Sequence, residues 1–299
     1  MRWHNVAENG VDWIVERVAS CFSENREIVA AFVFGSAATG RLMAESDIDV
    51  AVYFAPAPHG NDRAFLELEE ECARYPQEYA LWDSLEKAIG RPIDLVVLNR
   101  APATLAASVV LNGVPCVVHD QALMDRFARA VTTLAEEFRD FTRDFAQIRG
   151  RSRSLSEIDR ACLLRILDFL GEELMDGGQF ANLSQAGYLN DRALRRNVER
   201  WAENLVTASI DVAKIVLASQ GLPMPQTFRE TLSELVAIPG FREIAMELAA
   251  FSRVRNLLAH EYLDARYPEI RRVVDRANDL YGTLARVTRE WISAQEGST

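Results

Sequence analysis

The first 120 residues alternate short apolar runs with stretches of helical periodicity. Four of the apolar runs are rich in β-branched or aromatic residues and bounded by Gly, Pro or Asp, which is typical of buried strands. These runs are Ala30–Phe34, Ile48–Phe54, Ile93–Leu98 and Val114–His119. Between the second and the third, Asn61–Ile89 carries apolar residues at helical spacing and stops before Gly90. The pattern predicts an α/β domain with a mixed sheet.

After about Leu123 the strand pattern disappears and the rest of the chain is predicted to be helical. The expected helices are Asp125–Ile148, Ser156–Asp176, Gln185–Ser219, Thr227–Val236, Phe241–His260 and Pro268–Gln295. The stretch 149–154, with Gly150 followed by alternating Arg and Ser, is typical of a hinge. We therefore expect an α/β domain over 1–148, a hinge at 149–154 and an all-α helical bundle over 155–299.

Composition is consistent with this division into two domains. The chain has 299 residues, 49% of them hydrophobic and 26% charged, as in ordinary globular proteins. No apolar run approaches the roughly 18 residues of a membrane span, and the first residues do not resemble a signal peptide, so a cytoplasmic protein is expected. The four cysteines are scattered, which argues against a disulfide framework or a structural zinc site.

The net charge of −11 counts against a protein whose whole surface binds nucleic acid. It leaves room for a local basic cleft, because arginines gather in two clusters. These clusters are Arg149, Arg151 and Arg153, and Arg192, Arg195, Arg196 and Arg200. Each cluster can equally be a solvated helix face or linker.

Candidate chemistry begins where the first strand ends, at Gly35 and Ser36. Glycine lets the backbone approach a triphosphate, and Ser36 offers a hydroxyl and an amide N–H. Asp47 and Asp49 are two positions apart on a strand, so both carboxylates point to the same face. Asp94 opens another strand and could act as a general base. Carboxylates on one face beside a phosphate cradle are what Mg²⁺ needs to bridge nucleotide phosphates.

The residues from Phe34-Gly35-Ser36 to Ser46-Asp47-Ile48-Asp49 closely resemble the nucleotidyltransferase superfamily, in its minimal (MNT) branch. The resemblance covers about residues 25–120. It implies transfer of a nucleoside monophosphate, usually AMP from ATP, with Asp47 and Asp49 holding Mg²⁺ and Asp94 as the third carboxylate.

A second constellation lies near the C-terminus, where Arg255, Asn256 and His260 are followed by Tyr262. Asn256 and His260 are four positions apart, so they share a helix face. The imidazole could exchange a proton with a ribose 2′-OH or a leaving oxygen, and Arg255 could stabilise the anionic phosphorus. Such RNA cleavage needs no metal.

Three stretches carry a second resemblance, to HEPN domains of the DUF86, HepT-like type: Val198–Lys214, Pro225–Glu230 and Arg255–Tyr262. The likeness extends over about Ser156 to Tyr281. It implies a helical bundle that forms a homodimer and brings two Arg-x4-His motifs into one cleft. Many members are ribonucleases, often toxins of prokaryotic toxin–antitoxin pairs.

The two resemblances together imply a fused HEPN–MNT protein, in which the transferase attaches AMP to the tyrosine two residues after the motif histidine. Tyr262 occupies that position. AMP there would add bulk and negative charge beside Arg255 and so block RNA. Here both modules share one chain, where the family commonly has two. The helical domain could equally have lost its nuclease activity and serve only in dimerisation or substrate binding.

Two other functions stay open. An aminoglycoside-type nucleotidyltransferase would use the helical domain to hold a small polycationic substrate, which the acidic balance suits. A non-catalytic regulatory or scaffold protein would bind neither ATP nor Mg²⁺. The complete set from Arg255 to Tyr262 argues against the antibiotic-type enzyme, which has no need of it.

Overall fold

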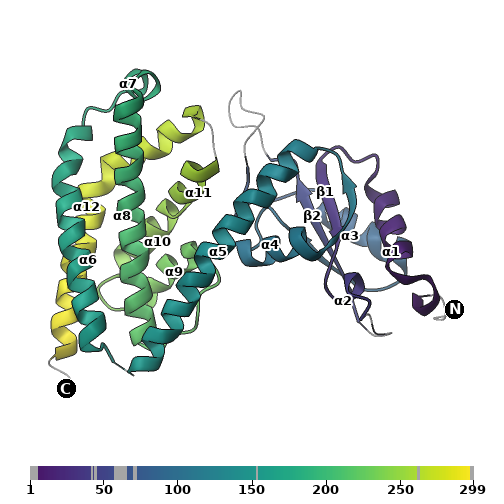
Figure 1. Ribbon diagram of the computed structural model, residues 1–299, viewed down its shortest axis with the longest axis horizontal. Helices are drawn as coiled ribbons and strands as arrows, with labels where there is room; N and C mark the ends of the chain where they lie inside the picture. Colours follow the sequence, from purple (N-terminus) through teal and green to yellow (C-terminus); the bar gives the residue numbers. More distant parts are fainter. Residues whose placement is uncertain are drawn as a thin grey trace. The chain divides into compact units, whose positions relative to one another are not determined.

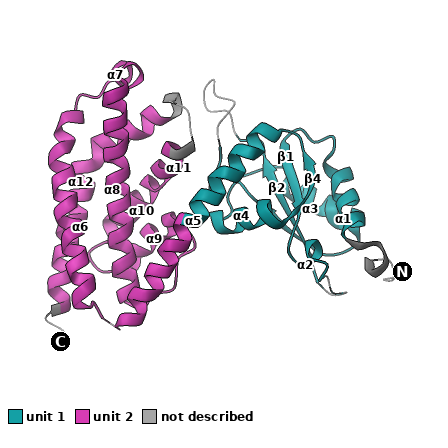
Figure 2. Ribbon diagram, viewed as in Figure 1, with its two compact units in different colours: residues 1–136 teal, residues 137–299 magenta. Residues whose placement is uncertain are grey.

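The computed structural model describes residues 6–41, 43, 46–56, 66–69, 73–152, 154–260 and 263–296; the side chains of 6–10, 259–265 and 296 lie outside that description. Contacts divide the chain into two compact units, residues 1–136 and 137–299 (Figure 2). The boundary falls inside one long helix, α5, so the domain limits expected from the sequence, including the hinge at 149–154, stay a prediction.

The first unit is built on a four-stranded mixed sheet, which confirms the expected fold class (Figure 1). Its strands are β1 (Ile28–Val33), β2 (Ile48–Phe54), β3 (Ile93–Val97) and β4 (Val114–Val118). Their order is β3-β2-β1-β4, with β1 antiparallel to both β2 and β4 and β3 parallel to β2. All four lie where apolar runs predicted them.

Helices cover both faces of this sheet. On one face α1 (Val6–Phe22) and α3 (Glu78–Ile89) bury apolar residues such as Val18 and Leu85 against the strands. On the other face lie α4 (Ala103–Asn112) and the first part of α5 (Gln121–Arg151), with Phe127 fully buried. Alternate β2 side chains face opposite cores, so Asp49 lies on the same face of the sheet as Ala51 and Tyr53, near the start of the strand.

The helix expected over Asn61–Ile89 was wrong at the described residues 66–69 and 73–77, and α3 begins only at Glu78; residues 61–65 and 70–72 of the prediction lie outside the described residues. The described residues 66–69 are not helical, and Leu66, Glu67 and Leu68 are all buried. Glu67 accepts a hydrogen bond from Asn99 Nδ2 at 2.8 Å, and the same amide group also donates to Phe54 O at 3.0 Å. These tertiary contacts fix the segment in a non-helical path.

The second unit is helical. Its elements after α5 are α6 (Glu157–Asp176), η1 (Gly177–Phe180), α7 (Gln185–Asn190), α8 (Arg192–Ser219), α9 (Phe228–Ser233), η2 (Glu234–Ala237), α10 (Arg242–Phe251), α11 (Arg253–His260) and α12 (Leu263–Glu296). Three long helices, α6, α8 and α12, pack on one another side by side (Figure 1). The apolar side of α8 supplies much of the core, from Val198 to Leu217.

Two predicted helices are divided in the structure. Gln185–Ser219 breaks at Asp191, whose side chain accepts hydrogen bonds from the N–H groups of Ala193 and Leu194 and so caps α8. Phe241–His260 breaks at Ser252, between α10 and α11. Short polar residues make such breaks favourable because their side chains satisfy the exposed backbone groups.

The last helix begins at Leu263, so Pro268 lies inside it and does not start it as predicted. None of the helices in the described part of the chain is long and apolar enough to cross a membrane.

Candidate active site

The turn after β1 brings the backbone against a carboxylate of β2. Gly35 adopts a φ of +64° and opens the short helix α2 (Gly35–Ala38). The N–H of Phe34 donates to Asp49 O at 3.0 Å. A Cβ added at Gly35 would lie 2.1 Å from Asp49 Oδ2. Only glycine therefore fits at this position, on grounds of both backbone conformation and space.

Parallel pairing of β2 and β3 places Asp49 directly opposite Asp94. Burial raises the pKa of Asp49 above its usual range, and the charges of Asp94 and Asp47 raise it further, while the backbone N–H of Ser36 opposes the shift. The three predicted carboxylates and Ser36 therefore share one electrostatic environment. Within the described residues, no three His, Cys, Asp or Glu side chains are close enough to form a complete metal-binding group.

A buried arginine holds the segment that leads into β2. Arg91 donates from Nη2 to Met43 O at 2.8 Å and also to Ser46 O. The N–H of Ile48 donates to Pro92 O at 3.0 Å. Sequence reasoning missed Arg91, because an arginine beside a turn is ordinarily exposed; its place between Gly90 and the Asp94 strand is the only signal it offers.

In the second unit the motif residues Arg255, Asn256 and His260 lie on α11. The His260 side chain and the whole of Tyr262 lie outside the described residues. Arg255 Nη2 donates to Glu137 Oε2 of α5 at 2.8 Å, and its guanidinium lies 4.5 Å from the centre of the Phe228 ring of α9. Neither Glu137 nor Phe228 was predicted from the sequence as part of this site.

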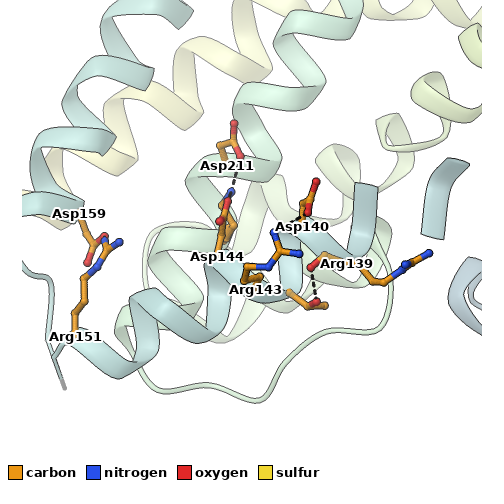
Figure 3. Close-up of polar contacts among 9 residues, drawn as sticks. Arg139, Asp140, Arg143, Asp144, Arg151, Asp159 and Asp211 are labelled. Atoms are coloured by element: carbon orange, nitrogen blue, oxygen red, sulfur yellow. Dashed lines mark hydrogen bonds and ion pairs between the residues drawn. The ribbon is translucent and has the colours of Figure 1, made fainter. Parts of the chain in front are cut away.

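Arg255 also lines a pocket of about 710 Å³, together with residues of α5, α6 and α8. Both predicted arginine clusters contribute to it, through Arg151 and Arg200. Arg151 pairs with Asp159 (Figure 3). Arg200 pairs with Glu203 at 3.0 Å. Arg195, by contrast, donates to Tyr188 O and Leu189 O and so has a structural part.

The carboxylates that meet on β2 and β3 beside a glycine turn, followed by a separate helical unit, define a nucleotidyltransferase-type domain joined to an α-helical domain. The comparisons agree with this class. A model described as "Polymerase beta, Nucleotidyltransferase" matches residues 16–122. A model described as "Ribonuclease HepT-like" matches residues 131–287, which is more than half of the chain. The chain belongs to the ribonuclease HepT-like family and carries the nucleotidyltransferase domain ahead of it.

Solved structures of toxin–antitoxin proteins are similar to parts of this chain. One, described as "Crystal structure of the toxin-antitoxin with AMP-PNP", is 20% identical, covers 44% of this chain and 95% of its own, and has a TM-score of 0.36. Another, "Crystal structure the toxin-antitoxin MntA-HepT", is 18% identical over 46% of this chain and 96% of its own, with a TM-score of 0.34. No curated protein matches the chain.

Replacing Gly35 with alanine is expected to displace Asp49 and to abolish nucleotidyl transfer. The left-handed backbone and the clash with Asp49 Oδ2 should together lower the free energy of unfolding by about 1–3 kcal/mol. Gly40→Ala is the matched control, because Gly40 has a φ of +70° but no atom within 4 Å of an added Cβ. Gly40→Ala should therefore show the backbone cost and keep the activity. Equal loss of activity in both variants would contradict this role of Gly35.

Replacing Asp49 with asparagine is expected to stabilise the nucleotide-free protein at neutral pH. The pKa of Asp49 is raised in the folded state, so the folded protein prefers the protonated carboxyl, and stability is lost as pH rises through that pKa. Asn carries no charge, so the Tm of the variant should exceed that of the wild type at neutral pH and converge with it in acid.

The control for this comparison is Asp12→Asn, at an exposed position on α1. Its Tm should follow the wild type at every pH. A lower Tm for Asp49→Asn than for the wild type at neutral pH would show that the hydrogen bond from Ser36 outweighs burial and repulsion.

Proposed function

We propose that this chain is a fused HEPN–MNT protein, in which the first unit transfers AMP from ATP to Tyr262 and thereby silences a metal-independent ribonuclease in the second. The observation that carries the proposal is the position of Asp49, which lies against Gly35 and opposite Asp94 and has its pKa raised by the charges of Asp94 and Asp47. The presence of the Arg255-to-Tyr262 motif in the same chain supplies both the nuclease and its acceptor.

Each site residue has a defined part in the transfer. The Ser36 hydroxyl and the Gly35–Ser36 backbone bind the triphosphate, and Asp94 accepts the proton of the acceptor hydroxyl. The acceptor oxygen forms a bond to the α-phosphorus as the bond to pyrophosphate breaks. Mg²⁺ held by Asp47, Asp49 and Asp94 would neutralise charge on the phosphates, and carboxylate oxygens are the donors it prefers.

Charge repulsion supports the fit of a cation at this place. The pKa of Asp49 is raised by its neighbours Asp94 and Asp47, so a divalent cation among them would relieve unfavourable interactions that the folded chain already contains. This donor chemistry suits Mg²⁺ better than a soft metal, because neither Cys nor His is among the predicted ligands.

The second unit is proposed to act as a homodimer. Helix α6 exposes large apolar side chains, which is unusual for a helix that already packs on two others. They are Ile158, Leu164, Phe169 and Met175. A second copy that covers this face would bring two Arg255–His260 motifs into one assembly, as a symmetric cleft requires.

The aminoglycoside-type alternative gains no comparable support. Its helical domain would serve to bind a small polycation, whereas the pocket beside Arg255 carries five cationic side chains against four acidic ones. The match of residues 131–287 to the ribonuclease HepT-like family also favours the fused HEPN–MNT function.

Intact mass tests the transfer directly. Purified protein incubated with ATP and Mg²⁺ should gain one or more AMP units, and Tyr262→Phe should gain none. Asp49→Asn, which keeps Tyr262, should also gain none. This result would show that the chain's own nucleotidyltransferase site transfers the AMP. A protein that arrives unmodified, binds ATP and gains no mass would contradict the proposal and leave the antibiotic-type transferase as the alternative.

Ribonuclease activity should appear when Tyr262 cannot be modified. We expect Tyr262→Phe to cleave single-stranded RNA in the presence of EDTA, and a further Arg255→Ala change to lower the rate by about 100-fold or more. The products should end in a cyclic phosphate. Cleavage that needs Mg²⁺ would point to a different mechanism.

A further inference from the structure

The guanidinium of Arg255 already has an anionic partner in this chain. Glu137, on α5, accepts a hydrogen bond from Arg255 Nη2 at 2.8 Å. The Arg255 side chain is 19% exposed and that of Glu137 is 47% exposed, so the pair lies at the edge of the unit with Arg255 on the inside. An RNA phosphate that bound Arg255 would have to compete with this carboxylate.

The aromatic ring of Phe228 positions the Arg255 guanidinium independently of Glu137. Phe228 lies under the guanidinium and is packed edge-on by Phe138 and Phe141 of α5, at 5.1 and 5.5 Å between ring centres. A cation over an aromatic face keeps its edge N–H groups free to bind an anion. The loss of Glu137 would therefore leave Arg255 positioned but without a partner at Nη2.

The same arrangement recurs two helical turns further along α5. Lys214 lies 5.7 Å from the centre of the Phe141 ring and pairs with Asp144 of α5 at 3.2 Å and with Asp211 at 3.0 Å. Figure 3 shows Asp144 facing Asp211 across this contact. Glu137 and Asp144 are seven positions apart, so they share one face of α5. That face thus offers two carboxylates to two cations, each of which lies over an aromatic ring.

Both cations line the pocket of about 710 Å³. Four of the cations that line it are paired with carboxylates: Arg151 with Asp159, Arg200 with Glu203, Lys214 with Asp144, and Arg255 with Glu137. Acidic side chains of the protein thus neutralise a basic pocket that contains the motif arginine. Of the four pairs, the two with Lys214 and Arg255 depend on the shared face of α5.

We propose that Glu137 and Asp144 of α5 occupy two phosphate-binding positions of the ribonuclease site, at Arg255 and Lys214, and so act as an intramolecular competitor of single-stranded RNA. The carboxylates stand in for phosphate oxygens, since both are anionic acceptors that a guanidinium or an ammonium group binds in the same way. This inference rests on the proposed ribonuclease function and adds a second means of control, separate from modification of Tyr262.

The location of the two carboxylates gives this competition a physical basis. They lie on the helix that also contributes Phe127 and Val131 to the core of the first unit, so the competitor is permanently attached and its local concentration is high. RNA must displace both carboxylates at once to bind both cations. Removal of the two carboxylates should therefore increase the affinity for RNA and let Arg255 and Lys214 contact its phosphates.

RNA binding by the full-length chain tests the proposal. Glu137→Gln, Asp144→Asn and the double variant are made in the Tyr262→Phe background and titrated with a short 2′-O-methyl single strand, which binds but is not cleaved. Glu137→Gln should tighten binding by roughly tenfold, which is the low end for close charge pairs. Asp144→Asn should have a smaller effect in the same direction, because Asp211 still pairs with Lys214 at 3.0 Å. The slope of log K against log salt should steepen by about 0.7 for each cation released.

Two controls separate release of the cations from a general change of charge. Glu136→Gln and Asp140→Asn alter exposed acids of the same helix, of which Asp140 pairs with Arg143 at 3.0 Å and not with Arg255 or Lys214. Both changes should leave affinity and slope unchanged. Adding Arg255→Ala to Glu137→Gln should remove the gain. Circular dichroism and Tm confirm that each variant is folded.

The outcomes distinguish this inference from the proposed function. Tighter binding with a steeper slope supports the competitor, even if RNA is never cleaved, in which case the ribonuclease proposal alone fails. Unchanged or weaker binding by folded Glu137→Gln and Asp144→Asn overturns the competitor. Slower cleavage by Glu137→Gln in a Tyr262→Phe protein that does cleave RNA would also overturn it, because Glu137 would then position Arg255 for catalysis.

Discussion

The side chain of Asp49 is held between the backbone of Gly35 and the carboxylate of Asp94 on the neighbouring strand. Burial and two like charges act against its ionised form, and the N–H of Ser36 compensates only in part. The ionised Asp49 therefore lowers the free energy of unfolding, and the surrounding sheet must offset this loss. Strands β1 and β2, buried almost throughout, provide the compensating stability.

That constraint explains several neighbouring features. Gly35 has no Cβ because Asp49 Oδ2 fills the space, and Arg91 is buried because the loop ahead of Asp47 needs a donor to its carbonyl groups. In the proposed function, a cation and an anionic substrate at this site would relieve the repulsion that the folded chain contains without them. A local loss of stability is common where a protein holds binding groups preorganised for their ligand.

Charge compensation takes the opposite form in the second unit. There Arg255 and Lys214 have carboxylate partners within the chain, and an aromatic ring lies beneath each of them. The site of the first unit thus keeps like charges together, whereas the pocket of the second unit pairs opposite charges. Under the proposed function, internal pairing would control the ribonuclease-type domain without separation of the two domains.

Much of the fold could be predicted from periodicity, because strand and helix patterns are local: all four strands lie where apolar runs placed them, and α6 matches its predicted range to one residue. The motif from Gly35 to Asp49 was also visible, since its spacing is a property of one continuous stretch. The non-helical path of Leu66–Leu68 and the breaks at Asp191 and Ser252 were not predicted, because burial and side-chain capping decided them.

The two fold classes, the Gly35-to-Asp49 motif and the Arg255–His260 motif could be predicted from the sequence, because each depends on residues close together along the chain. Packing between distant segments places Asp94 opposite Asp49, Arg91 against Met43 and Ser46, and Arg255 against Glu137 and Phe228. Glu137 and Arg255 are 118 residues apart, and nothing in the local pattern marks either as the other's partner. Such pairs form only when packing brings distant helices into contact, and it is there that the charge of the site is set.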